Sequence, residues 1–225
     1  MSASACVIEH VVLFKVKPET PSDKVQALLD GIYGLRELDG VLDLTLAPVL
    51  NLWPAHISWA AGFTHVLDGR YKDKASLDAY TISSAHVSVV ENYVKPIIYG
   101  LLALDWEAKP SPPVNEGLGV IRTALLKLKE GVTAEDIETL LMTFNSYPNI
   151  FPCVGQVSAG PNFSPARAQG YNYGYVAQFK SVKELEELTA NSDHVALMET
   201  KVNPHVESFI LVDSFKESQA ALARI

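Results

Sequence analysis

The chain has 225 residues, of which 48% are hydrophobic and 20% charged, and its formal net charge is −8. This composition is typical of a globular protein and excludes a disordered or collagen-like chain. The negative charge, with no Lys/Arg cluster, argues against a nucleic-acid partner, and no apolar run reaches the roughly 20 residues that span a bilayer. We therefore expect a soluble protein with no nucleic-acid and no membrane partner.

The first half of the chain predicts strands that are apolar on both faces, together with amphipathic helices. Ser22 is the expected N-cap of the first helix, which ends at Asp39-Gly40. The expected elements are, in chain order, a strand at 6–16, a helix at 22–38, strands at 41–48 and 59–71, a short helix at 76–80, a break at 81–84, a helix from 85 to about Pro96, and a strand at 99–106.

A loop between the second and third strands is five residues longer than its counterpart in the second half. It holds Trp53, His56 and Trp59. Such a loop either covers the mouth of a pocket or packs on the surface, and both interpretations stay open.

The second half repeats the first. A Pro-rich linker at 109–117 divides the chain into residues 1–108 and residues 118–225. The segment from Gly62 to Asp105 aligns without gaps on that from Gly170 to Asp213, with 11 of 44 positions identical. The expected elements of this half are strands at 120–128, 154–158, 171–180 and 209–215, and helices at 133–147 and 181–202.

This order predicts an α+β protein made of two tandem ferredoxin-like units. In each unit a four-stranded antiparallel sheet carries its helices on one face. Because the strands are apolar on both faces, the second face must also be buried. We expect the two sheets to pack against each other as an A/B barrel within one chain; whether two chains also form a homodimer is left open.

Three short words of the first half carry a family resemblance: Glu9-His10-Val11-Val12-Leu13-Phe14-Lys15, Gly62-Phe63-Thr64-His65-Val66 and the stretch from Tyr80 to Val87, Tyr-Thr-Ile-Ser-Ser-Ala-His-Val. With them the chain resembles the stress-responsive dimeric A/B barrel (Dabb) family, in its tandem, two-domain plant form. One enzyme of the family, olivetolic acid cyclase, closes a polyketide thioester by aldol condensation. The resemblance matches its Tyr–His pair to Tyr80 and His86, and two further pocket histidines to His10 and His65.

The resemblance implies a stress-response protein that binds a small apolar or acyl ligand, with His86 as base and Tyr80 as acid in a cyclase-like or lyase-like reaction. On one continuous helix, Tyr80 and His86 would point about 120° apart. The helix break between them lets both face one pocket, and a helix N-terminus with Ser83 or Ser84 as cap favours a neutral imidazole at His86. A neutral imidazole can take a proton from a carbon next to a carbonyl.

A competing interpretation makes the protein a non-catalytic stress-response or interaction protein. His86 recurs as His194 although Tyr80 is replaced by Leu188, so the His can serve to lock the helix break. His10 and His65 lie on apolar strands, where core histidines are common. The counterparts of His10 and His65 are Arg122 and Tyr173, which makes the second half the degenerate copy.

No cofactor is required by these residues, and no His or Cys spacing of a metal site occurs. The family resemblance implies that Mg²⁺ can be held by backbone carbonyls at about 33–39, a site that leaves no side-chain signature. The last three residues, Ala223-Arg224-Ile225, resemble a peroxisomal import signal. We therefore expect a peroxisomal protein, with the cytoplasm as the alternative.

Overall fold

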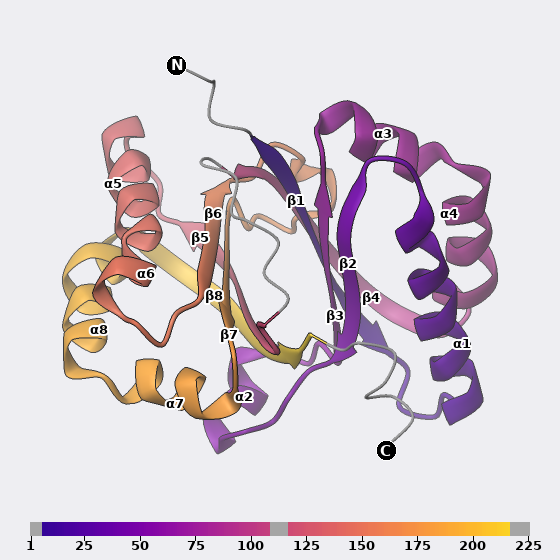
Figure 1. Cartoon of the computed structure of the whole chain (residues 1–225), viewed down its shortest axis with the longest axis horizontal. Coiled ribbons are helices and arrows are strands. Elements are labelled where there is room, and N and C mark those ends of the chain that lie inside the picture. Colours follow the sequence, from indigo (N-terminus) through magenta and orange to yellow (C-terminus); the bar gives the residue numbers. More distant parts are fainter. Residues whose placement is uncertain (1–5, 109–116, 217–225) are drawn as a thin grey trace.

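The computed structural model describes residues 6–108 and 117–216, and these form two four-stranded antiparallel sheets that face each other, with helices on both outer faces (Figure 1). The fold is the tandem ferredoxin-like α+β barrel predicted from the sequence. Within the described ranges, no helix combines the length and the apolarity needed to cross a membrane.

The first sheet has the strand order β2-β3-β1-β4, with β1 paired to both β3 and β4. Its helices α1, α3 and α4 cover the outer face (Figure 1). The elements of this repeat are β1 (Val7–Val16), α1 (Ser22–Tyr33), β2 (Val41–Pro48), α2 (Pro54–Trp59), β3 (His65–Tyr71), α3 (Lys74–Ile82), α4 (Ser84–Val89) and β4 (Ile98–Ala108).

The second sheet repeats this topology in the order β6-β7-β5-β8, which confirms the duplication at the level of strand pairing. Helices α5, α6, α7 and α8 lie on its outer face (Figure 1). The elements are β5 (Val120–Leu128), α5 (Ala134–Asn145), α6 (Tyr147–Ile150), β6 (Gln156–Pro161), β7 (Tyr173–Phe179), α7 (Val182–Ala190), α8 (Ser192–Leu197) and β8 (Val206–Phe215).

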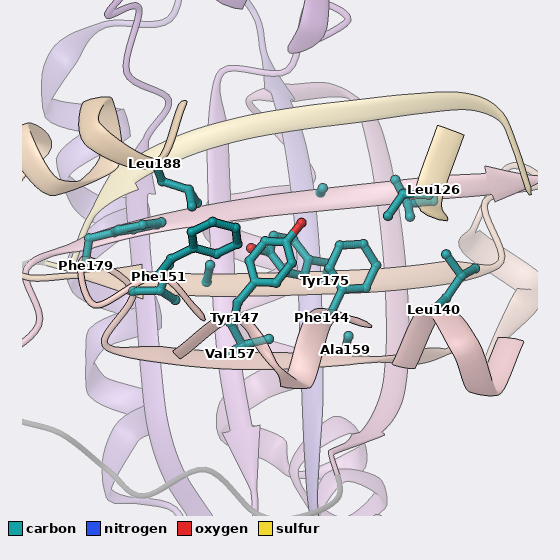
Figure 2. Packing of buried hydrophobic residues seen from close by; sticks show 14 of the residues in the cluster. Leu126, Leu140, Phe144, Tyr147, Phe151, Val157, Ala159, Tyr175, Phe179 and Leu188 are labelled. Carbon is teal, nitrogen blue, oxygen red and sulfur yellow. The ribbon is translucent and has the colours of Figure 1, made fainter. Parts of the chain in front are cut away.

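Three apolar clusters hold these layers together. One lies between each sheet and its own helices, and the third lies between the two sheets. Trp106 of β4 extends into the third cluster and donates its indole N–H to Ser158 Oγ of β6 at 2.9 Å. As expected, the face of each sheet that points away from its helices is buried, because the two repeats pack against each other. Figure 2 shows the second-repeat cluster, in which the rings of Phe144, Tyr147 and Tyr175 lie next to one another.

The structure differs from the expected elements at three places. The strand expected at 59–71 begins only at His65, because residues 54–59 form helix α2. Pro21, rather than Ser22, is the N-cap of α1, and no side chain caps that helix. The helix expected at 133–147 is interrupted at Ser146, and the short α6 that follows begins at Tyr147, with Pro148 in its first turn.

Candidate functional site

A cavity of about 570 Å³, including its open mouth, lies between the first sheet and helices α1, α3 and α4. We call it cavity one. Strands β1, β3 and β4 supply its floor, and α4 with the helical turn after it supplies a wall. The lining residues are His10, Val12, Phe14, Ile32, Leu67, Tyr80, Thr81, His86, Val90, Val94, Leu101 and Arg167.

The break between α3 and α4 brings Tyr80 and His86 to this cavity. At Ser83 the backbone is extended, with φ −61° and ψ 142°, so the two helices point in different directions. Ser83 Oγ accepts the His86 backbone N–H at 3.2 Å and caps α4. The Tyr80 and His86 rings end with their centroids 4.6 Å apart.

His86 is held as a neutral base. Its Nδ1 lies 3.0 Å from the Thr81 carbonyl oxygen, and because a carbonyl can only accept, Nδ1 carries the proton. The lone pair of the neutral ring is then on Nε2. Burial lowers the pKa of His86, and the charges of His10 and Arg167 lower it further, so that the ring is neutral at pH 7. Burial raises the pKa of Tyr80 to about 12, which keeps its hydroxyl protonated as a donor.

His10 forms a buried pair with Asp105 of β4. Its Nδ1 lies 2.5 Å from Asp105 Oδ1, and each residue is 5% exposed. Sequence reasoning missed the role of Asp105, although a signal was present: Asp105 is one of the identities between the repeats, and Asp213 takes the same place. The carboxylate orients the imidazole of His10 at the cavity floor.

Tyr71 is a second residue that the sequence did not single out. Its ring lies between those of His10 and Tyr80, with centroid distances of 6.0 and 5.0 Å. Its hydroxyl is buried, and burial together with the neighbouring Tyr80 hydroxyl raises its pKa. Tyr71 therefore joins the His10–Asp105 pair to the Tyr80–His86 pair as an aromatic contact.

His65 is not among the residues that line cavity one. It lies at the first position of β3, opposite Phe14 and Pro48, and its Nδ1 is 2.9 Å from Thr64 Oγ1. Burial lowers its pKa to about 4. The structure thus brings three of the four expected pocket residues together and places His65 in the core.

The second repeat has a smaller cavity, about 390 Å³, at the equivalent position. We call it cavity two. Arg122 takes the place of His10 and donates from Nε and Nη2 to the two Asp213 oxygens at 2.9 and 3.0 Å. Leu188 replaces Tyr80, while His194 packs edge-on against Tyr147 and Phe151. The second repeat therefore retains a cavity but lacks the Tyr–His pair.

The long loop of the first repeat packs against the second. Leu50 N–H donates to the Asp213 carbonyl at 2.7 Å, and Leu52 and Trp53 pack on the second-repeat cluster. The Trp53 ring lies 6.0 Å from the Arg122 guanidinium carbon. Of the two interpretations left open, the structure supports packing, and the surface covered belongs to the other repeat.

Metal binding and targeting stay predictions. Among the described residues, no group of three or more His, Cys, Asp or Glu side chains could hold a metal ion. The Mg²⁺ site implied at 33–39 would use backbone carbonyls, and two of these, at Leu35 and Leu38, already accept the N–H groups of Leu38 and Val41. The targeting residues Ala223, Arg224 and Ile225, and linker residues 109–116, lie outside the described residues.

The fold and the paired cavities define a tandem A/B barrel protein. Residues 8–108 and 120–216 each match the stress-responsive A/B barrel domain, so the chain belongs to the Dabb family, with two domains in tandem.

Relatives in Arabidopsis thaliana agree with this assignment. The chain is 36% identical over 92% of its length to one stress-response A/B barrel domain-containing protein of this plant, covering 78% of that protein. It is 34% identical to a second Arabidopsis stress-response A/B barrel domain-containing protein, covering 92% of this chain and 95% of that one. A solved anthrone oxidase-like protein shares the fold, with a TM-score of 0.63 at 8% identity, over 95% of this chain and 92% of that chain.

Proposed function

We propose that the first repeat binds a small apolar or acyl ligand in cavity one and acts on it by acid–base chemistry of the polyketide-cyclase or lyase type. The observation that carries this proposal is that one cavity is lined by Tyr80, His86 and His10 together. Its remaining walls are mostly aliphatic, which suits an apolar ligand.

The proposed step is proton abstraction from a carbon next to a carbonyl. His86 Nε2, whose lone pair is free when Nδ1 donates to Thr81, takes the proton. The Tyr80 hydroxyl donates to the oxygen on which negative charge develops. His10, oriented by Asp105, supplies a second polar group at the floor. Such assistance typically contributes about 10² to 10⁴ in rate, with the cavity shape selecting how the ligand folds.

A second candidate is a non-catalytic stress-response or interaction protein with structural histidines. The bond from His86 to the Thr81 carbonyl favours it, because this bond fastens α4 to the end of α3. The two candidates differ in what the loss of the Tyr80 hydroxyl should do, since Tyr80 fastens the break through its backbone carbonyl, which accepts from Ser83 N–H and Ser83 Oγ at 3.2 and 2.9 Å.

The test is native mass spectrometry and product analysis with two probe sets, medium-chain acyl thioesters and 3,5-dioxoacyl thioesters. We expect the wild type to bind members of one set and convert them, and Tyr80→Phe to bind the same members with turnover lowered about 100-fold or more. His86→Gln should also lose turnover. Leu188→Ala is the matched control in the second repeat and should turn over normally. Equal binding with no product from any variant would favour the structural candidate.

Peroxisomal localisation is proposed with the cytoplasm as its alternative, and it rests on Ala223-Arg224-Ile225. A fluorescent fusion that leaves these residues at the end of the chain should give a punctate signal in plant cells. A diffuse signal would refute it.

A further inference from the structure

A loop of the second repeat forms part of the mouth of cavity one. The loop runs from Pro161 at the end of β6 to Gly170 before β7, and it contains a short 3₁₀ turn, Pro165–Arg167. Arg167 is the cavity-lining residue that comes from the second repeat, and the other eleven come from the first.

This loop is fastened to β4 of the first repeat. Phe163 N–H donates to the Asp105 carbonyl at 2.9 Å, and Asn162 Oδ1 accepts the Asp105 N–H at 3.0 Å. Gln169 Nε2 donates to the Leu101 carbonyl at 2.8 Å, and Ala168 is buried between the sheets. The backbone that carries Arg167 is therefore fixed by contacts on both sides of it.

Arg167 brings a positive charge that the cavity does not neutralise. Its side chain is exposed, and among residues 6–108 and 117–216 no carboxylate pairs with it. The other basic groups at cavity one are accounted for, because Asp105 pairs with His10 and His86 is neutral. An apolar cavity with a single unpaired guanidinium at its mouth is complementary to an apolar molecule with an anionic end.

Cavity two shows the opposite arrangement. Its arginine, Arg122, is committed to both oxygens of Asp213, and its Nη1 donates to Thr189 Oγ1 at 3.0 Å. The first-repeat loop that packs on the second-repeat cluster presents Leu52 and Trp53, which are uncharged and do not line cavity two. Among the residues that line cavity two, none offers an unpaired positive charge.

We propose that Arg167 makes cavity one selective for ligands that carry a carboxylate on an apolar body, with the carboxylate at the mouth and the body against the aliphatic wall. This inference rests on the proposed ligand-binding function. A carboxylate fits because the planar guanidinium can donate two parallel hydrogen bonds to its oxygens. The second repeat thereby determines what the first repeat accepts.

The experiment compares decanoate with 1-decanol, two probes with the same tail, by isothermal titration calorimetry on the full chain. The wild type should bind decanoate about five- to tenfold more tightly than decanol, the size expected of a charge-assisted contact that is partly exposed to water. Arg167→Gln should lose that preference while keeping its affinity for decanol. Lys183→Gln removes one charge from an exposed position on α7 and should behave as the wild type.

The outcomes separate this inference from the function on which it rests. If the wild type binds both probes equally, or Arg167→Gln keeps the preference, the inference is overturned and ligand binding stands. If the wild type binds neither probe, both are overturned. The position of the bound tail is checked by the His86 imidazole resonance, which should shift on titration with either probe because His86 lines the cavity.

Discussion

The two cavities are built on one scaffold and differ at their polar residues. The last strand of each repeat carries an aspartate at the same position, Asp105 or Asp213. Asp105 pairs with His10 in the first repeat, and Asp213 pairs with Arg122 in the second. A histidine follows the helix break in both. In the first repeat its Nδ1 donates to the Thr81 carbonyl, whereas in the second the His194 ring packs edge-on against Tyr147 and Phe151.

This difference shows which residues belong to the scaffold and which to the chemistry. The aspartate and the histidine after the break are common to both repeats, so the fold can use them without a reaction. Tyr80 and His10 occur only in the first repeat, and they give cavity one a phenol hydroxyl and an imidazole at its floor. At the equivalent position of cavity two, Arg122 places a guanidinium that is paired with Asp213.

The buried Arg122–Asp213 pair should give the largest effect when broken. Arg122→Met removes the two hydrogen bonds that Arg122 donates to the carboxylate of Asp213, which is 0% exposed. We expect the free energy of unfolding to fall by about 3–5 kcal/mol, measured by urea denaturation. His10→Met should cost less, about 1–3 kcal/mol, because Asp105 loses one hydrogen bond and not two.

The double variant Arg122→Met/Asp213→Asn is the control, since it removes the buried negative charge of Asp213 together with the guanidinium of Arg122. It should recover part of the stability lost by Arg122→Met. A double variant less stable than the single one would contradict the argument from an uncompensated charge.

The two repeats contribute side chains of different size to the interface between the sheets. Gly174 is the position at which this difference can be tested. A Cβ placed there would lie 2.3 Å from Trp106 Cζ3, whereas the equivalent pair of positions holds Val66 and Ser214. Gly174→Ala should lower the free energy of unfolding by about 1–3 kcal/mol through overpacking. In a Trp106→Phe background the same change should cost clearly less; an equal cost in both backgrounds would show that the indole ring is not the obstacle.

The sequence was sufficient for the duplication, the two ferredoxin-like sheets and the packing of one sheet on the other, because strand periodicity and apolar faces depend on local residue types. It also indicated that Tyr80 and His86 could share a pocket, since a helix break was expected at 81–84 between them. It could not place His65, because a histidine on a strand that is buried on both faces gives no sign of which neighbours surround it. The sequence also could not predict that Arg167 lines cavity one, because Arg167 approaches this cavity across the interface between the repeats.

The two histidines that follow the helix breaks, His86 and His194, should differ in how they affect stability when the pH is lowered. Burial lowers the pKa of His194 to about 4, below the value of about 6.5 in an unfolded chain. Between these values only the unfolded chain binds the proton, so stability is complete above pH 6.5 and falls as the pH is lowered toward 4.

We expect His194 to account for a loss of about 1 kcal/mol between pH 7 and pH 5, after allowance for its partial exposure. Urea denaturation of His194→Phe at both pH values should show a flatter dependence, with stability at pH 7 retained because the phenyl ring can pack against Tyr147 and Phe151. His86→Phe should instead lose about 1 kcal/mol at pH 7 with the Thr81 bond. The same pH dependence in His194→Phe as in the wild type would contradict this assignment.

The smallest expected effect concerns the positive charge of Arg167, which belongs to the second repeat and acts on His86 of the first. The charge of Arg167 helps to lower the pKa of His86, so Arg167→Gln should raise that pKa slightly, as expected when an exposed and screened charge is removed. An NMR titration of the His86 imidazole measures this without any ligand. The difference in the pKa of His86 between the wild type and Arg167→Gln should disappear at high salt, and Lys183→Gln should leave the titration unchanged.

If His86 is the base of a reaction, the loss of activity on acidification should occur at a higher pH in Arg167→Gln than in the wild type, because the His86 ring then becomes protonated at a higher pH. An unchanged or lowered pKa would mean that Arg167 does not act on the first repeat through its charge.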